Sequence, residues 1–325
     1  MAQGEKTMTQ PTFTVESIAL ETEPAKLEAA FENVKDDFDL ILAILRNENT
    51  PESVLMELID DEDGESTFGD DYETLVIEAV KNPHLPKSEI SRFAKSPDSL
   101  LRKAIACNPS TDTFTLSVLC NDPISEVVSA VASHPNITAD LMDYLSPHEN
   151  SYVRTALAKN ENLSDKIAGI LVDDENPYVR VALASNPMVK AEILHLLASD
   201  KDANTRSAVA KNDSTDVDDL TDLAFDEKKE VIKAVATNIK LAGDIVSILS
   251  KDENSYVRTG IASNPNLDDE AIEQLSHDES PYVRSELAAN AALSVEQLDV
   301  LKKDVNMFVR SAAHKTIKAK ITTTE

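Results

Sequence analysis

Two columns of oppositely charged residues recur along the chain with a common period of 26 in the residue numbering. An aspartate is followed six residues later by an arginine, in the pairs Asp174 and Arg180, Asp200 and Arg206, Asp252 and Arg258, Asp278 and Arg284, and Asp304 and Arg310. Periodic charges of opposite sign predict a structural ladder of ion pairs between stacked repeats. A row of arginines that binds phosphate groups is the alternative. The net charge of −28 argues against it, because nucleic-acid binding needs a basic surface.

An aromatic residue opens a recurring phrase, Tyr-Val-Arg or Phe-Val-Arg. It occurs at five places that keep the same period: Tyr152, Tyr178, Tyr256, Tyr282 and Phe308. We expect these rings to be semi-buried between repeats. If they are exposed instead, they are candidate anchors for a binding partner, since Tyr offers a large rigid contact and a hydroxyl group.

The stretch Asp60–Glu73 contains eight acidic residues and no basic residue. Its carboxylates at Asp61, Asp63, Asp70 and Asp71 are candidate contacts for a partner. A calcium loop of the EF-hand type is the alternative, but aligning Gly64 with the loop glycine puts Ile59 where the first carboxylate is needed. A solvated acidic loop is therefore predicted.

The residues needed for catalysis or cofactor binding form no recognisable constellation. The six histidines fall at different positions of the repeat, and there is no glycine-rich phosphate-binding loop. The two cysteines, Cys107 and Cys120, do not make a disulfide framework and suit a reducing compartment. The sequence thus predicts a protein that is not an enzyme, without metal or cofactor, in the cytoplasm.

The columns belong to a repeat that recurs without insertion from the start at residue 74 to the start at residue 308. Numbered from the aromatic residue, positions 2 and 6 are apolar, as the inner face of a short helix A requires. Asn at position 9, often followed by Pro, predicts the end of helix A, because Asn tolerates the left-handed conformation. Its side-chain amide is expected to form hydrogen bonds with the backbone. Apolar residues at positions 17 and 20 predict a helix B, with a capping residue at position 13.

The phrase built on Arg180, Ala182, Ala184, Asn186, Pro187, Leu194, Leu197 and Asp200 resembles the leucine-rich repeat variant family, over residues 39–315. The ladder is also similar to that of HEAT repeats. The resemblance implies an all-α solenoid, a right-handed superhelix of about ten two-helix repeats, in which one helix can be 3₁₀. The iron–sulfur cluster of that family is not expected here, because two cysteines cannot supply its four thiolates.

The repeat defines the expected domain organisation. Residues 1–22 are predicted to form a flexible tail, 23–38 a capping helix, 39–315 the solenoid with an acidic insertion at 60–73, and 316–325 a second tail. No run of 18 apolar residues occurs, so no membrane span is expected. A solenoid grows by addition, so one elongated domain is predicted.

These features favour a non-enzymatic scaffold or structural component that binds a protein partner with a basic surface. The acidic charge repels nucleic acid and attracts basic proteins, although adaptation to salt would produce the same composition. An acidic decoy or chaperone-like binder of a basic, nucleic-acid-binding protein is the first alternative, and an enzyme with a site hidden in the sequence is the second. The ends of the array could also build a homo-oligomer or a larger assembly.

Overall fold

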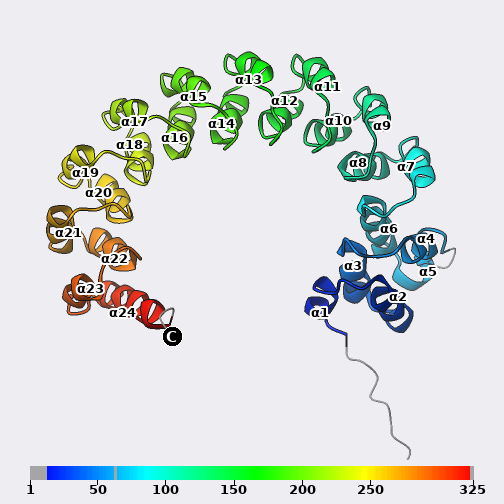
Figure 1. The fold of residues 1–325 in the computed structure, drawn as a ribbon, viewed down its shortest axis with the longest axis horizontal. Helices are drawn as coiled ribbons and strands as arrows, with labels where there is room; N and C mark the ends of the chain where they lie inside the picture. Colours follow the sequence, from blue (N-terminus) through cyan, green and yellow to red (C-terminus); the bar gives the residue numbers. More distant parts are fainter. Residues whose placement is uncertain (1–12, 62–63, 323–325) are drawn as a thin grey trace, which may run out of the picture. The chain divides into compact units, whose positions relative to one another are not determined.

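The structure, a computed structural model, describes residues 13–61 and 64–322, and all regular secondary structure in these residues is α-helical. The chain divides into two units, Met1–Leu157 and Ala158–Glu325, with the boundary inside one helix. The single elongated domain that the sequence predicts stays a prediction. Each unit is described by itself below (Figure 1).

The first unit contains an irregular N-terminal part followed by regular pairs of helices. Its helices are α1 (Val15–Ala19), α2 (Pro24–Asn33), α3 (Phe38–Arg46), α4 (Glu52–Ile59), α5 (Gly64–Phe68), α6 (Asp71–Lys81), α7 (Lys87–Phe93), α8 (Ser99–Cys107), α9 (Thr113–Leu119), α10 (Ser125–Ala132), α11 (Ala139–Leu145) and α12 (Ser151–Ala158), which contains the boundary.

The second unit consists of regular pairs throughout. Its helices are α13 (Asp165–Leu171), α14 (Pro177–Ser185), α15 (Ala191–Ala198), α16 (Ala203–Lys211), α17 (Val217–Leu223), α18 (Lys229–Ala236), α19 (Gly243–Leu249), α20 (Ser255–Ala262), α21 (Asp269–Ser276), α22 (Pro281–Ala289), α23 (Val295–Leu301) and α24 (Met307–Thr322). In the described residues of this unit, both helices of each repeat are α-helices, so neither is the 3₁₀ helix that the resemblance allows.

The even-numbered helices of the second unit are the predicted helices A, and they pack on one another in series from α14 to α24. The odd-numbered helices B form a second row beside them (Figure 1). Val179 and Leu183 in α14, at positions 2 and 6 of their repeat, are fully buried. Leu275 in α21, at position 20 of its repeat, is also fully buried. Each repeat therefore buries its apolar face against its neighbours, which is the packing of an α-solenoid.

Helix B begins at the predicted capping position. Asp112, Thr138, Ser164 and Asp268 each accept a hydrogen bond from the backbone N–H three residues later. Ser294 forms a complete capping box with Gln297. These short polar side chains satisfy backbone donors that the first turn of a helix leaves unpaired.

Helix A ends at the Asn column, as predicted, and the Asn side chains bond to the backbone, but the backbone there is not left-handed. Asn212 has an extended backbone, with φ −76° and ψ 127°, and none of the described non-glycine residues has a positive φ. Its side-chain amide donates to the carbonyl oxygens of Ala184 and Asn186 in the preceding repeat, and its Oδ1 accepts from the N–H of Ser214. The side chains of the Asn column thus link successive helices A by hydrogen bonds, and the Asn backbone does not adopt the left-handed conformation.

The same kind of hydrogen bonding reveals a degenerate repeat at the N-terminal end. The amide of Asn47 donates to the carbonyl oxygens of Ile18 and Glu21. Helix α1 packs on α3 as one helix A packs on the next, and α2 packs beside it on α3 and α4. The predicted flexible tail, 1–22, is wrong for residues 15–19, and its residues 1–12 lie outside the described part.

Two further expectations change. The region 316–322, predicted as a tail, continues helix α24 to Thr322, while residues 323–325 lie outside the described part. The acidic insertion, predicted as a solvated loop, contains helix α5 and is anchored by Tyr72, whose hydroxyl donates to the carbonyl oxygen of Leu58 at 2.6 Å. Gly64 is buried against the Tyr72 ring, and a Cβ at this position would clash with the ring.

Candidate functional site

The arginine column at position 3 is turned inward between successive turns. Arg180 donates from Nε and Nη2 to the two carboxylate oxygens of Asp200, at 2.6 and 3.0 Å, and from Nη1 to the carbonyl oxygen of Asp174 at 2.6 Å. The Arg180 and Asp200 side chains are 5% and 7% exposed. The arrangement recurs in Arg206 with Asp226, Arg258 with Asp278, and Arg284 with Asp304.

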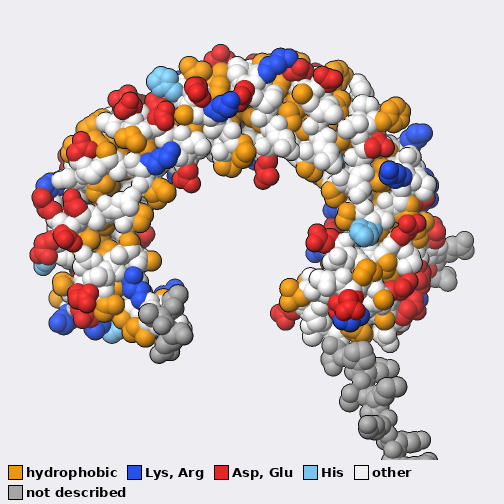
Figure 2. Space-filling view, in the orientation of Figure 1, with side chains coloured by type: hydrophobic (Ala, Val, Ile, Leu, Met, Phe, Trp, Pro, Cys, Tyr) orange, Lys and Arg blue, Asp and Glu red, His pale blue; other side chains and the backbone are white. Residues whose placement is uncertain are grey.

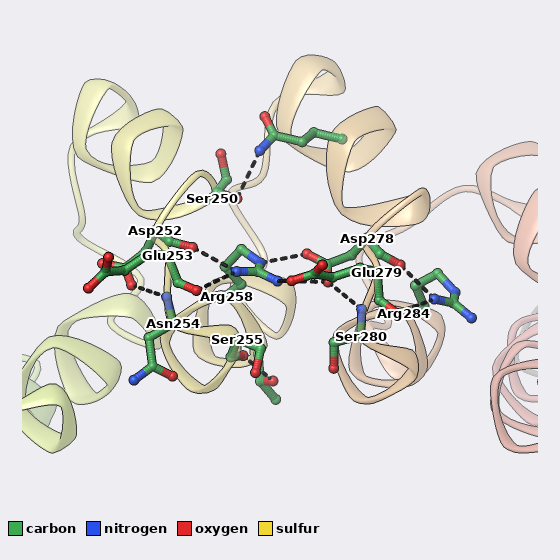
Figure 3. Close-up of polar contacts among 12 residues, drawn as sticks. Ser250, Asp252, Glu253, Asn254, Ser255, Arg258, Asp278, Glu279, Ser280 and Arg284 are labelled. Atoms are coloured by element: carbon green, nitrogen blue, oxygen red, sulfur yellow. Dashed lines mark hydrogen bonds and ion pairs between the residues drawn. The ribbon is translucent and has the colours of Figure 1, made fainter.

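The register of this ladder differs from the one that the sequence suggests. Each of these arginines pairs with the carboxylate twenty residues after it, and the aspartate six residues before it contributes its backbone carbonyl. Figure 3 shows Arg258 held in this way between Asp252 and Asp278. The guanidinium donors are thereby used within the protein, which leaves little for a phosphate ligand.

The ion pairs of Asp200 and Asp304 lower the pKa values of these two carboxyl groups. The Arg284 guanidinium lowers the pKa of Asp304, more than burial raises it. Burial would raise the pKa of Asp200, but the hydrogen bonds from Arg180 and from the Asp202 N–H outweigh it and leave that pKa below its ordinary value. These carboxylates remain charged at neutral pH and act as fixed structural anions.

The last arginine of the column, Arg310, donates to the carbonyl oxygens of Asp304 and Val305. In the first unit, Arg102 pairs with Asp122 at 2.6 Å, and this pair is not among those predicted from the sequence. Its signal is present in the sequence, because Arg102 occupies position 3 of its own repeat.

The aromatic column at position 1 is exposed, and the expectation of semi-buried packing is wrong. The exposed fractions are 76% for Tyr152, 75% for Tyr178, 80% for Tyr282, 68% for Phe308 and 46% for Tyr256. Four of the rings lie in the second unit, where Tyr256, Tyr282 and Phe308 belong to the successive helices A α20, α22 and α24. The column therefore presents a recurring aromatic surface to solvent.

Tyr256 is the least exposed tyrosine of the aromatic column, and a lysine side chain covers the face of its ring. The Nζ atom of Lys233, from the preceding helix α18, lies 3.9 Å from the centre of the Tyr256 ring. This is a cation–π contact. Neither Lys233 nor this contact is predicted from the sequence, although Lys233 occupies position 4 of a helix A, where the other repeats of the second unit have Val, Ser or Thr.

Shallow hollows lie on the helix A surface beside this column. One is lined in the first unit by residues that include Lys103, Cys107, Ser129, Ser133 and Tyr152, and another in the second unit by residues that include Val181, Ser185, Asn204, Ser207 and Lys211. The side chains at positions 4 and 8 that line these hollows are mostly small. Tyr152 therefore borders a hollow of mostly small side chains, and at the second hollow position 1 is occupied by Asn204.

The acidic candidates form no compact cluster. Asp61, Asp70 and Asp71 are exposed, and Asp63 lies outside the described residues. Within residues 13–61 and 64–322, no group of three or more His, Cys, Asp or Glu side chains could hold a metal ion. Figure 2 shows Asp and Glu side chains scattered over the visible surface, with hydrophobic side chains exposed between them.

Comparisons with known proteins bear on the class of fold. No protein-family model matches the chain, and no curated protein matches it in sequence. Among solved structures, a leucine-rich repeat variant with a novel repetitive structural motif matches with a TM-score of 0.50 and 22% identity, covering 69% of this chain and 88% of that one. A second match, to computationally designed armadillo repeat proteins for modular peptide recognition, covers 94% of this chain and 98% of that one, with 14% identity and a TM-score of 0.14.

The stacked helix pairs and the match to the leucine-rich repeat variant together define an α-solenoid of that type. The predicted resemblance is thus confirmed at the level of the fold. In the part of the chain that the structure describes, no helix is long and apolar enough to cross a membrane.

Proposed function

We propose that this protein is a non-enzymatic scaffold that docks a protein partner on the aromatic column of its second unit. The observation that carries the proposal is the exposure of Tyr178, Tyr282 and Phe308 at 75%, 80% and 68%. The buried core does not need these side chains, yet they recur at one position of the repeat. Exposed aromatic residues are enriched among the anchors of protein interfaces.

The internal polar groups supply a second reason. The arginine and asparagine side chains form hydrogen bonds with groups of neighbouring repeats. Such a framework holds the helix A row rigid, so a partner meets a preorganised surface and little ordering entropy is lost on binding. The two free thiols suit a reducing compartment, and a cytoplasmic location is part of the proposal.

The test is a pull-down with the tagged full chain from its native source, at about 0.1 M and about 0.5 M salt, since screening weakens contacts between exposed charges. A double variant, Tyr282→Ala with Phe308→Ala, should lose a stoichiometric partner that the wild-type chain retains at both salt concentrations. Tyr144→Ala is the matched control, because Tyr144 is 56% exposed but lies on helix α11 of the helix B row.

The acidic decoy is the second candidate, and the net charge of −28 favours it. It predicts a different outcome of the same experiment. Many basic proteins would bind at low salt, none at high salt, and the aromatic substitutions would change nothing. That pattern would overturn the scaffold proposal.

A separate variant tests the acidic insertion as the docking surface. Neutralising Asp61, Asp70 and Asp71 to Asn should leave the partner bound if the aromatic column is the anchor. Loss of the partner in this variant alone would move the site to the insertion.

A further inference from the structure

We propose that the partner presents an extended segment with regularly spaced Lys or Arg side chains, and that each cation sits on the face of one position-1 ring. This inference rests on the proposed function and names the chemistry of its partner. It does not follow from the net charge alone, because it assigns the cations to particular rings.

The chain already contains one copy of this contact. Lys233 places its ammonium group 3.9 Å from the centre of the Tyr256 ring, and Tyr256 is 46% exposed where Tyr282 is 80% exposed. An ammonium group above an aromatic face is attracted by the negative potential of the ring. The position-1 ring is therefore placed so that a lysine from outside its own helix can reach its face.

The neighbouring glycine shows how closely this lysine packs. Gly260 lies one turn after Tyr256 on α20, at position 5, where four other repeats of the second unit have Ala182, Ala208, Ala234 and Ala312. A Cβ at residue 260 would lie 2.9 Å from the Cγ of Lys233. The aliphatic stem of Lys233 thus occupies space that alanine fills elsewhere.

The next two rings have no internal lysine at the corresponding place. The residue equivalent to Lys233 is Thr259 before Tyr282 and Ser285 before Phe308. Both side chains are short, and Thr259 donates its hydroxyl hydrogen to the Ser255 carbonyl of its own helix. The faces of Tyr282 and Phe308 are consequently available to cations of a partner.

An acidic residue accompanies each tyrosine of the column. A glutamate stands three residues before the tyrosine, on the turn that leads into helix A, at Glu149, Glu175, Glu253 and Glu279. The side chains of Glu253 and Glu279 are 92% and 88% exposed. Where a repeat from residue 74 onward opens with another residue, the same place holds Asp71, Pro97, Pro123, Lys201, Glu227 or Val305. Glutamate at this place therefore goes together with tyrosine at position 1, with Glu227 as the exception.

These glutamates add charge that the ladder does not need. Arg258 is already paired with both carboxylate oxygens of Asp278, and Glu279 lies 3.4 Å from the same guanidinium on the solvent side (Figure 3). Arg258 and Asp278 neutralise each other, so Glu279 adds a negative charge next to the start of the helix that carries Tyr282. Glu253, which precedes Tyr256, lies 3.7 Å from the ammonium group of Lys229. An aromatic face next to a carboxylate suits a Lys or Arg head group better than a neutral apolar one.

The spacing of the rings sets the spacing of the cations. Packed helices lie about 8–10 Å apart. An extended segment in the polyproline II conformation has three residues per turn and rises about 3.1 Å per residue, so every third side chain lies on the same face and advances about 9 Å. A segment with a basic residue at every third position can therefore place one cation on each of Tyr282 and Phe308 in α22 and α24.

The test uses a fluorescent 12-residue peptide with Arg at every third position and Gly or Ser between, bound to the full chain and followed by anisotropy. Tyr282→Leu should weaken binding about 3- to 30-fold, the range for a cation–π contact. Tyr282→Phe should bind nearly as well as wild type, since it keeps the ring. Lys233→Ala should bind more tightly, because it opens the face of Tyr256.

Two comparisons make the result decisive. A peptide with citrulline in place of Arg has the same shape without the charge and should bind at least tenfold more weakly. Tyr144→Leu and Glu192→Gln, on helices B, should leave binding unchanged. Equal losses in Tyr282→Leu and Tyr144→Leu, or equal binding of the citrulline peptide, would overturn the inference.

The inference can fail while the proposed function stands. Loss of the native partner in the Tyr282→Ala and Phe308→Ala variant, together with no binding of the arginine peptide, would mean that the column docks a partner that is not basic. Retention of the partner by that variant would instead remove the proposed function itself.

Discussion

The arginine column and the aromatic column stand two residues apart in the same phrase, but the arginines are largely buried and the aromatic rings are exposed. Arg180 is buried, with its guanidinium bound by Asp200 and by the Asp174 carbonyl, whereas Tyr178 is 75% exposed. Equal periodicity in the sequence thus accompanies two different roles. A repeated residue is required at its position, but only its surroundings show whether the repeat itself or a partner requires it.

The largest effect that separates the two columns should come from removing one partner of a rung. Arg180→Ala leaves Asp200 charged and buried without its cation, and we expect the free energy of unfolding to fall by about 3 kcal/mol. Urea unfolding followed by circular dichroism measures this. Tyr282→Leu should change it by less than about 0.5 kcal/mol, as substitutions of exposed side chains usually do.

Two controls test whether the rung effect comes from an unpaired buried charge. Replacing both partners, in Arg180→Met with Asp200→Leu, should recover most of the lost stability. Lys190→Ala breaks the exposed ion pair with Asp165 and should have no measurable effect. A similar loss in Lys190→Ala and Arg180→Ala would contradict the distinction between the columns.

A smaller effect is expected at the Asn column, which is also buried but uncharged. Asn212→Ala removes the amide that donates to the Ala184 and Asn186 carbonyls and the oxygen that accepts from Ser214. Leaving these buried groups unpaired should cost about 2–3 kcal/mol in unfolding experiments. Asn204→Ala, at an exposed position of the same repeat, is the matched control and should be close to wild type.

Asn212→Asp gives a sharper form of this experiment. The carboxylate would face the two carbonyl oxygens with no hydrogen to donate, so Asn212→Asp should be less stable than Asn212→Ala at neutral pH. If the two variants are equally stable, the hydrogen bonds donated by the side-chain amide do not hold the two repeats together.

The smallest effect should be the pH dependence of a single rung. The folded-state pKa of Asp304 lies below its ordinary value of 3.8, because Arg284 binds the charged form. The rung therefore stabilises the fold above about pH 4 and loses that contribution as pH falls through the lowered pKa. The difference in unfolding free energy between wild type and Asp304→Asn should be constant from pH 7 to about pH 5 and shrink below about pH 4.

A carboxylate on the surface provides the control for this experiment. Glu279→Gln removes a solvent-exposed carboxylate, so its stability relative to wild type should show little change over the same pH range. A difference for Asp304→Asn that persists undiminished at pH 2 would show that the lost hydrogen-bond geometry, rather than the charge, accounts for the effect.

Several features are predictable from the sequence because they depend on local chemistry. The leucines at position 20 are buried in every repeat of the second unit, since their spacing alone places them on the inner face of helix B. The caps at Asp112, Thr138, Ser164, Asp268 and Ser294 follow from short polar side chains at a helix start. By contrast, α1 escapes prediction because so short a helix carries too little periodicity to be recognised.

The candidate site is predictable only in part. The position of the aromatic column is explicit in the sequence, but its exposure is not, because an aromatic residue at a regular position fits a core and a surface equally well. Lys233 and Gly260 stand out in the sequence as departures from their columns. Their meaning depends on α18 lying beside α20, which places the lysine stem over position 5 of the next helix.

The sequence by itself determined the repeat, the two helices in it and the residues at which they begin and end. These features depend on spacing along one helix, which the chain carries from residue to residue. Only the tertiary structure decided that Arg180 binds Asp200 rather than the carboxylate of Asp174, that Asn212 is extended, and that the tyrosines face solvent. Each of these depends on how one repeat stacks on the next, because stacking fixes which groups of neighbouring repeats come within hydrogen-bond distance and which side chains are left outside.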